Sequence, residues 1–359
     1  MGTFSDTTIL VIIAVVKIAV VLTVLLTCIA YATWLERKVV AHIQARWGPY
    51  LVGPHGLLQP VADGAKFILK EDIVPAEADK FIYWLAPFLG FVLAFLSIAV
   101  IPFGEDFGDV FTVHGHPIKF QITDLNVGLL FVFAVTSLGV YSIALAGWSS
   151  NSKYPLLGGL RSSAQMISYE LSLGLAVIGV IMMAGTLSLH KIVDAQNHTW
   201  YIHGINTWLP HWYIFVQPIG FFVYFTSAIA ETNRVPFDLP EGETELVGGF
   251  HTEYSSMKFA MFFMSEYANM VTVSCLATLL FFGGWHGPVF GWLPTIVRIF
   301  LPVFWFSLKV FCFMFFYIWM RGTLPRFRYD QLMSLGWKFL LPLGLLNILV
   351  TSFLIAWHG

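Results

Sequence analysis

Long apolar runs separated by short polar segments are the feature that most restricts how this chain can fold. A membrane-spanning helix needs about 20 residues, at 1.5 Å each, to cross about 30 Å of hydrocarbon. Only 11% of the residues are charged, against roughly 25% in soluble domains. The sequence therefore predicts an all-α polytopic membrane protein with about eight transmembrane helices, in which residues 1–359 form a single integral membrane domain. The approximate predicted spans are residues 8–33, 81–103, 124–147, 164–186, 213–231, 258–283, 293–320 and 336–357.

Basic residues gather in alternate loops between these runs. An even number of spans places both chain ends on one side of the membrane, and loops rich in Lys and Arg face the cytoplasm. We therefore expect both termini on the outer, periplasmic side of a bacterial inner membrane, in preference to an organellar inner membrane. The loops assigned to the cytoplasm carry Arg37, Lys38, Arg46, Lys66, Lys70, Lys80, Lys153, Arg161, Arg234, Arg321, Arg326 and Arg328.

Residues 53–75 are too polar to span a membrane, but they have a helical pattern. Apolar residues recur at helical spacing, while Gln59, Asp63, Lys66 and Lys70 fall on another face. This pattern predicts an amphipathic helix that lies in the cytoplasmic interface. One interpretation is a membrane-surface anchor. The other is a wall beside a lateral entrance for an amphiphilic ligand.

The loop between the fifth and sixth predicted spans, at about residues 231–257, is unusually acidic for so apolar a chain. Neighbouring carboxylates repel one another and hold protons more tightly than isolated ones. We interpret the loop as a candidate proton relay or cation entrance. Its carboxylates surround the single cation Arg234 and belong to Glu231, Asp238, Glu241, Glu243, Glu245 and Glu253.

Two further acids lie inside predicted spans, Glu170 in the fourth and Glu266 in the sixth. A charge at membrane depth costs about 2.5–3.5 kcal/mol even on lenient scales, so such a group faces the protein interior and pairs or titrates. A structural ion pair is the alternative interpretation. Lys309, in the middle of the seventh predicted span, is a further candidate for proton transfer because a buried lysine titrates when it is desolvated.

Two short polar and aromatic segments, residues 147–161 and 321–331, are predicted cytoplasmic loops that present a surface to partner subunits. The alternative is that they only connect spans. The candidate docking residues are Trp148, Asn151, Lys153, Arg161, Arg326 and Arg328.

Several kinds of site are not expected from this sequence. The three cysteines form no CxxC pair, which argues against zinc and iron–sulfur sites built by this chain alone. Neither a GxGxxG motif nor a P-loop occurs, so NAD and flavin binding by those routes is not expected. The net charge of −2 gives no indication of nucleic-acid binding. Any electron transfer is therefore expected to occur in a partner.

Motifs distributed along nearly the whole chain resemble the H-type membrane subunit of respiratory complex I, the NADH:quinone oxidoreductase. The motifs that carry this resemblance are Glu36-Arg-Lys, Gln44-Ala-Arg-Trp-Gly-Pro, Gly56-Leu-Leu-Gln-Pro-Val-Ala-Asp-Gly-Ala-Lys, Gly147-Trp-Ser-Ser-Asn-Ser-Lys-Tyr, Ala164-Gln-Met-Ile-Ser-Tyr-Glu170, the acidic loop, and Pro325-Arg-Phe-Arg-Tyr-Asp-Gln-Leu.

The resemblance implies that the chain forms the entrance of a quinone tunnel, for ubiquinone or menaquinone, and an acidic channel that couples quinone reduction to proton translocation. It implies tunnel residues Arg37, Gln44, Arg46, Asp63, Arg234 and Phe263. With Lys309 added from its position, the expected proton relay comprises Glu36, Asp63, Glu170, Glu231, Glu241, Glu243, Glu245, Glu253, Glu266 and Lys309.

The implied partners are the iron–sulfur and quinone-site subunits of the peripheral arm, small membrane subunits and antiporter-like subunits, in contact with membrane lipid. An acid that some family members carry in the third span is absent between Gly128 and Gly147, so the relay is expected to pass through water, Ser137 or Tyr141 there. Three rival interpretations remain: the related anchor subunit of a membrane-bound hydrogenase-type complex, a stand-alone cation or proton transporter, and a purely structural anchor for which the in-span acids are dispensable.

Overall fold

The computed structural model describes residues 6–105, 112–113, 116–117, 119–202, 205–238, 247–288 and 294–358. Within these ranges, seven helical segments are long and apolar enough to cross a membrane, which confirms an all-α polytopic architecture. They are α1 (Asp6–Ile43), α3 (Lys80–Ser97, extended to Val100 by a 3₁₀ turn), α4 (Gly128–Ser149), α5 (Lys153–Ala184), α10 (Ser256–Phe281), α11 (Thr295–Thr323) and the segment Tyr329–Trp357. The last segment joins α12 (Tyr329–Ser334), a π-helical turn (Leu335–Leu340) and α13 (Leu341–His358).

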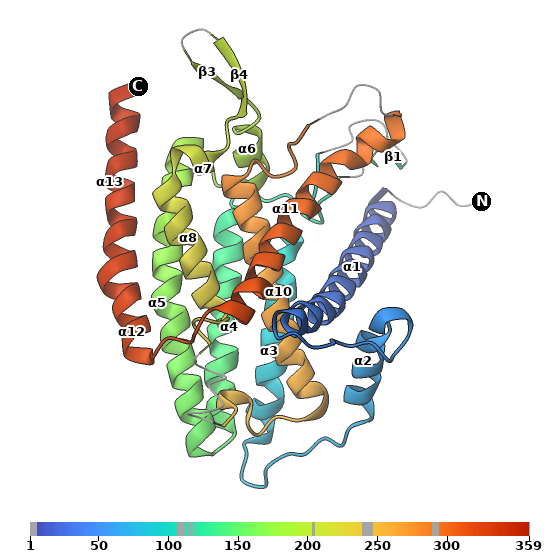
Figure 1. Ribbon diagram of the computed structural model, residues 1–359. Helices are drawn as coiled ribbons and strands as arrows, with labels where there is room; N and C mark the ends of the chain where they lie inside the picture. The colour runs from blue at the N-terminus through green and yellow to red at the C-terminus, as the bar shows by residue number, and fades with distance from the viewer. Residues whose placement is uncertain are drawn as a thin grey trace, which may run out of the picture.

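The fifth predicted span is helical, but it is broken and short. Helix α7 (Tyr213–Val216) is followed by α8 (Pro218–Glu231), and Gln217 between them is not helical. Pro218 explains the break, since proline lacks an N–H and disfavours the helical conformation of the preceding residue. At 14 residues, α8 is about 21 Å long. It therefore ends well before the lower ends of α4 and α5 (Figure 1).

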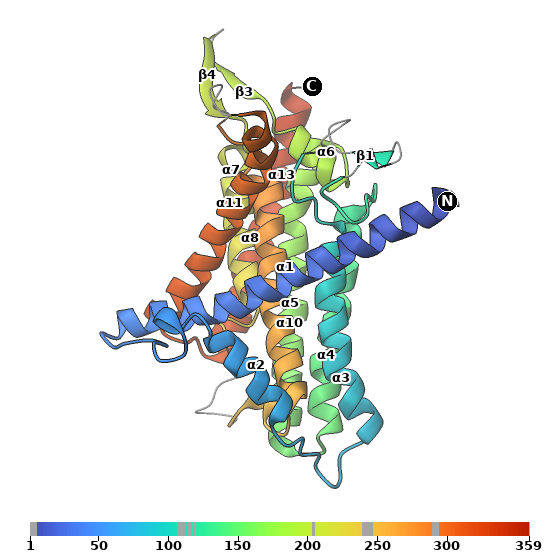
Figure 2. The same ribbon diagram turned by 90° about the vertical axis from the view of Figure 1, so that its right-hand side faces the viewer.

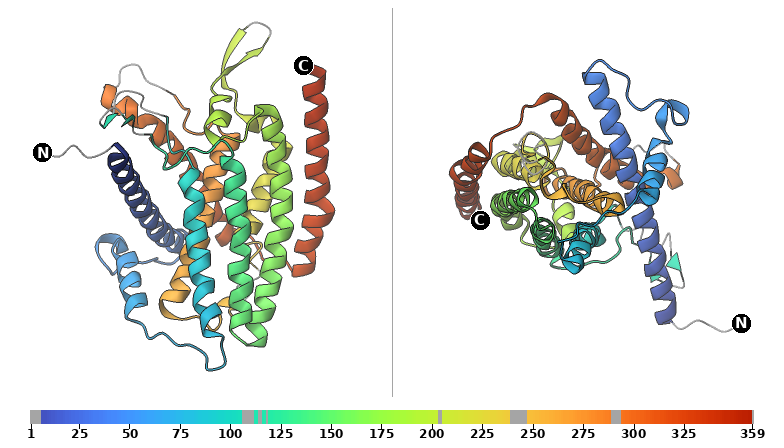
Figure 3. Two further views of the ribbon diagram at one scale, coloured as in Figure 1. Left: turned by 180° about the vertical axis from the view of Figure 1, so that it is seen from behind. Right: turned by 90° about the horizontal axis from the view of Figure 1, so that it is seen from below.

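Helices α3, α4, α5, α8 and α10 form a central bundle, and α1, α11 and α13 lie around it (Figure 1). Seen along the bundle, α1 and α13 lie on opposite sides of it (Figure 3). Small residues let neighbouring helices approach closely. A Cβ atom on Gly147 of α4, for example, would lie 2.6 Å from the Pro155 carbonyl oxygen of α5.

Helix α1 crosses the bundle obliquely (Figure 2). Its 38 residues make it about 57 Å long, nearly twice the thickness of the hydrocarbon layer. The predicted span ended at residue 33, but the helix continues to Ile43. Glu36 and Arg37 therefore lie on a rigid helix and not in a connecting loop.

The amphipathic helix is shorter than its predicted bounds of 53–75. A 3₁₀ turn (Pro54–Gly56) precedes α2 (Gln59–Leu69), which lies beside α1 and α10. The chain is extended from Lys70, and Pro75 prevents a longer helix. Asp79 then caps α3 by accepting hydrogen bonds from the amides of Phe81 and Ile82.

Two small β-hairpins, which the sequence did not predict, complete the described structure. They are β1 (Thr112–Val113) with β2 (His116–Pro117), and β3 (Thr199–Ile202) with β4 (Ile205–Pro210). The β3–β4 hairpin follows the short helix α6 (Leu189–Asp194) and projects from the end of the bundle where the C-terminus lies (Figure 1). Helix α2 and a 3₁₀ turn (Gly249–His251) lie toward the opposite end.

Candidate functional site

Arg234 is the centre of a buried ionic network in the bundle. It lies in the turn that follows α8 and is only 5% exposed. Its Nε atom is 2.8 Å from Oε1 of Glu266 on α10, and its Nη1 atom is 3.3 Å from Oε2 of Glu36 on α1. The guanidinium carbon also lies 4.3 Å from the centroid of the Tyr267 ring. One cation thus joins α1, α8 and α10.

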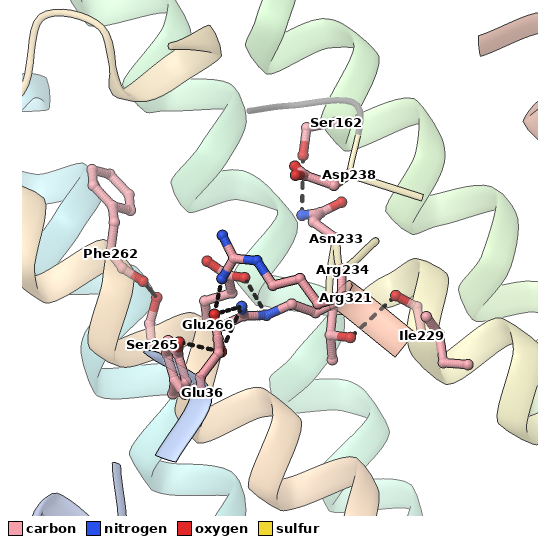
Figure 4. A network of polar contacts seen from close by, with 12 residues as sticks. Glu36, Ser162, Ile229, Asn233, Arg234, Asp238, Phe262, Ser265, Glu266 and Arg321 are labelled. Atoms are coloured by element: carbon pink, nitrogen blue, oxygen red, sulfur yellow. Dashed lines mark hydrogen bonds and ion pairs between the residues drawn. The ribbon is translucent and has the colours of Figure 1, made fainter. Parts of the chain in front are cut away.

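Glu36 has two further partners, which sequence reasoning did not assign to the site. Arg321, at the end of α11, forms an ion pair with Glu36, and the Tyr267 hydroxyl donates a hydrogen bond of 2.6 Å to Oε2 of the same carboxylate. Figure 4 shows Arg321 and Arg234 converging on Glu36 and Glu266. The sequence placed Arg321 only among the basic loop residues. For Tyr267, the only indication in the sequence is that it directly follows Glu266.

The network contains two carboxylates and two guanidinium groups, so its charges balance. Burial alone would lower the pKa of the Arg234 guanidinium, but Glu266, Tyr267 and Glu36 outweigh it and hold that pKa well above its ordinary value. Arg234 therefore remains a cation at any pH at which the protein is folded. A buried ion pair is stabilised when hydrogen bonds satisfy its charged atoms. In this network, Nε and Nη2 of Arg234 have no hydrogen bond within the described residues, although Nε lies 2.8 Å from Glu266.

A cavity of about 50 Å³ lies inside the bundle beside this network. A buried water needs about 10–15 Å³ of such space, so the cavity has room for roughly three waters. Helices α3, α4 and α10 and the turn after α8 supply most of its wall. Its polar lining residues are Thr136, Ser142, Glu231, Thr232, Asn233, His251, Ser265, Glu266 and Asn269.

Glu170 on α5 extends the acidic cluster beyond the cavity. Its carboxylate forms a hydrogen bond with the Ser137 hydroxyl of α4 and lies near enough to Glu231 for the two charges to interact. Oε2 of Glu231 is buried and has no hydrogen-bond partner within the described residues. Of the two third-span residues expected beside the relay, Ser137 contacts Glu170, whereas Tyr141 is 60% exposed. Glu170 and Glu231 interact electrostatically, Glu231 and Glu266 line the same cavity, and Arg234 joins Glu266 to Glu36. We call these four acids the acidic series.

A second, larger cavity of about 530 Å³ opens on the other side of Glu36. Small-molecule sites commonly measure about 300–1,000 Å³. Of the predicted tunnel residues, Arg37, Arg46 and Phe263 line this cavity, together with Glu36, Tyr267 and Arg321.

The other predicted tunnel residues lie in contact with these. Nη1 of Arg37 is 2.6 Å from Oδ2 of Asp63 on α2, so an ion pair connects α2 to α1. Gln44 accepts a hydrogen bond of 2.7 Å from Nε of Arg46, and Arg234 contacts the cavity wall through Glu36.

The structure does not bring every predicted relay residue into this series. Glu253 lines neither of the two cavities, and its backbone carbonyl accepts a hydrogen bond of 2.6 Å from the Tyr83 hydroxyl. Glu241, Glu243 and Glu245 lie outside the described residues.

Lys309 on α11 contacts the residues that follow α10, about 24 Å along that helix from Glu266 at 1.5 Å per residue. Its ammonium group donates hydrogen bonds of 2.7, 2.9 and 2.7 Å to the carbonyls of Phe282, Gly284 and His286. It also lies 4.7 Å from the Trp212 ring centroid. Burial lowers the pKa of the neighbouring His286 imidazole to about 4, so this histidine is neutral near pH 7. Lys309 thus fastens α11 to the end of α10.

The candidate docking residues have varied surroundings. The predicted loop 147–161 is wrong as a loop, because α4 continues to Ser149 and α5 begins at Lys153. Only a short turn remains at Asn151, where φ is 47°. Trp148 is 72% exposed, whereas Arg161 lies 5.8 Å from the Tyr329 ring centroid.

The second docking segment, residues 321–331, is a loop only between Thr323 and Tyr329. Within it, Arg326 has a side chain that is 41% exposed, and its Nη2 atom lies 3.0 Å from Oδ2 of the buried Asp238. Arg328 stays exposed and lies 3.6 Å from Asp330. Trp148 and Arg328 are strongly exposed, and Asn151, Lys153 and Arg326 are exposed as well.

Comparison with known proteins identifies the family. A family model described as NADH dehydrogenase matches residues 16–352. The chain is 57% identical over 357 residues to the second NADH-quinone oxidoreductase H subunit of Koribacter versatilis, covering 96% of this chain and 97% of the relative. It is 51% identical to the first such H subunit of Solibacter usitatus, with coverage of 96% and 97%, and 50% identical to the H subunit of Protochlamydia amoebophila, with coverage of 91% and 93%. The chain therefore belongs to the family of NADH-quinone oxidoreductase H subunits, and so to the membrane part of respiratory complex I.

Proposed function

We propose that this chain admits a quinone, ubiquinone or menaquinone, from the bilayer into the 530 Å³ cavity and couples its reduction to proton movement through the acidic series. The observation that carries this proposal is the position of Glu36. This single carboxylate lines the large cavity and is joined through Arg234 to Glu266, which lines the small one. A charge change in one cavity is therefore felt in the other.

The coupling step is electrostatic. Interacting carboxylates titrate as a unit, so a charge that appears beside Glu36 redistributes protons among Glu266, Glu231 and Glu170. Waters in the 50 Å³ cavity complete the path between carboxylates that do not touch. The redox centre itself belongs to an iron–sulfur subunit of the peripheral arm, and antiporter-like subunits receive the protonation signal. Both termini face the periplasm in this arrangement.

The hydrogenase-type anchor and the stand-alone transporter differ from this proposal in the features that each requires. A hydrogenase-type anchor has no need of an amphiphile-sized space at the level of α2, and a stand-alone transporter has no need of a partner's redox centre. The relatives are named as quinone oxidoreductase subunits, which supports the quinone interpretation.

Replacing Glu231 by glutamine tests the acidic relay. The amide keeps the side-chain volume but cannot bind and release a proton, so we expect quinone reduction and proton pumping to fall together by about tenfold or more. Both are measured in membrane vesicles that hold the assembled complex, with NADH oxidation by a water-soluble acceptor reporting the amount assembled. Glu170→Gln is expected to behave in the same way. Normal coupled turnover in both variants would contradict the relay.

Filling the small cavity tests whether water carries the proton without removing any acid. Gly139 lines this cavity, and a Cβ atom placed there meets no atom within 4 Å. The three added carbons of Gly139→Val occupy much of the space, so we expect a several-fold loss of proton-coupled turnover. Gly174→Val is the matched control, since Gly174 also has open space around its Cβ position but lines neither cavity. Equal turnover in the two variants would argue against a hydrated path.

Narrowing the large cavity tests quinone entry. Val40 on α1 lines it, and Val40→Trp is expected to raise the KM for quinone several-fold while leaving NADH oxidation by a water-soluble acceptor unchanged. Val24→Trp is the control, because Val24 lies on the same helix, is 56% exposed and lines neither cavity. An unchanged KM in Val40→Trp would place the quinone elsewhere.

A further inference from the structure

The turn Glu231–Asp238 is irregular backbone inside the bundle, because α8 ends well before the lower ends of its neighbours (Figure 1). At membrane depth, non-helical backbone is tolerated only where the protein itself satisfies its polar groups. Asn233, in the middle of the turn, has a φ of 51°, in the left-handed region that asparagine adopts more readily than most residues. The turn has hydrogen bonds of its own, such as that from the Phe237 amide to the Arg234 carbonyl, and side chains outside the turn add to them.

Gln165 on α5 does this with one amide group. Its Nε2 atom donates hydrogen bonds of 2.8 Å to the Ala230 carbonyl and 2.8 Å to the Phe237 carbonyl. These two carbonyls stand on either side of the segment that carries Glu231 and Arg234. Both amide hydrogens are used, which fixes the orientation of a side chain that is 0% exposed.

A second contact from the same helix face supports the turn. The Ser162 hydroxyl, three residues before Gln165, accepts a hydrogen bond of 3.3 Å from Nδ2 of Asn233 (Figure 4). Residues three apart on a helix lie on one face, so both contacts move with α5 as a unit. The same helix carries Glu170. Gln165 and Ser162 thus link the turn to the helix that carries Glu170.

We infer that Gln165 is a positioning residue for coupling: it fastens the Glu231–Asp238 turn to α5 and thereby fixes the distance from Arg234 to the carboxylates of Glu36 and Glu266. Gln165 touches neither the substrate cavity nor a charged group of the network within the described contacts. It acts through the backbone, and a functional constellation must be held to within about 0.5 Å. This inference rests on the proposed function of the acidic series.

Gln165→Met is the direct test, because methionine has a similar volume and no donor. Gln196 supplies a matched control. It is 1% exposed and donates hydrogen bonds to the carbonyls of Ile192 (3.2 Å) and Leu279 (2.9 Å), far from the acids. Its Oε1 atom also accepts hydrogen bonds from the amides of Tyr213 and Gly283, so its loss disturbs the fold at least as much.

The expected result is measured per assembled complex, with assembly reported by NADH oxidation with a water-soluble acceptor. Gln165→Met lowers quinone-dependent turnover several-fold and changes its pH profile, whereas Gln196→Met lowers only the amount of complex. If Gln165→Met fails to assemble, Gln165→Asn replaces it. This variant keeps an amide but is one methylene too short to reach both carbonyls, and an intermediate loss of turnover is expected.

The inference is overturned if the Gln165 variant that assembles matches Gln196→Met per assembled complex while Glu231→Gln still loses turnover. If Glu231→Gln also retains full coupled turnover, the proposed function itself fails. The two failures are therefore distinguishable in one series of membranes.

Discussion

Replacing Arg234 by methionine is expected to abolish quinone-dependent turnover and to reduce sharply the amount of assembled complex. The substitution removes the cation that contacts Glu266 at 2.8 Å and Glu36 at 3.3 Å, and leaves two carboxylates in a largely buried setting with one guanidinium, that of Arg321. Removing one partner from a buried ion pair costs about 3–5 kcal/mol, because the remaining charge is desolvated without compensation.

The experiment compares assembly and turnover in membranes, with two further variants. Arg234→Lys restores a charge but offers a point ammonium in place of a planar fork, so it is expected to recover assembly better than turnover. Lys191→Met is the control, since Lys191 is an exposed cation on α6 that lines neither cavity. An exposed charge of this kind contributes about 0–1 kcal/mol.

A double variant tests the cause of the Arg234 effect. Combining Arg234→Met with Glu266→Gln removes the uncompensated charge, so assembly is expected to recover in part while turnover does not. Full turnover in Arg234→Met would mean that the network is dispensable for coupling.

The sequence predicted the spans well because long apolar runs have one stable conformation in a bilayer. It predicted the fifth span as unbroken, although Pro218 is a local signal for a break, and the non-helical Gln217 is held by tertiary partners. Gln217 donates a hydrogen bond of 2.8 Å to Thr351 and accepts one of 3.0 Å from Asn347, both on α13. Buried polar contacts across 130 residues of sequence leave no local pattern.

The acids of the candidate site were predictable for a related reason: a carboxylate inside an apolar run is conspicuous. The cations that pair with these acids could not be predicted from the sequence. Arg321 meets Glu36 across 285 residues, and Arg234 meets it across 198. Each cation lies at the end of a helix, where a sequence pattern equally predicts anchoring at the cytoplasmic interface. The pairing follows from the tilt of α1, which carries Glu36 into the bundle beside α10 and α11 (Figure 2).

Lys309→Met separates the two interpretations of the in-span lysine. Its three carbonyl contacts and the Trp212 ring predict a structural role, because hydrogen bonds to a charged group contribute about 1.5–3 kcal/mol each. We expect less assembled complex and a lower temperature of irreversible inactivation, with an unchanged ratio of protons moved to quinone reduced. Lys17→Met is the control, since Lys17 is also in a span and its ammonium lies 3.4 Å from the Gln121 carbonyl oxygen.

A relay role for Lys309, as the sequence predicts, has the opposite signature: stable assembly with a lower proton ratio. The geometry favours the structural outcome for a physical reason. An ammonium that donates to three carbonyls has used its three protons, and a carbonyl accepts no transferred proton near neutral pH. A proton leaving Lys309 would break the junction of α11 with the end of α10, so proton transfer and structural integrity cannot both depend on this one group.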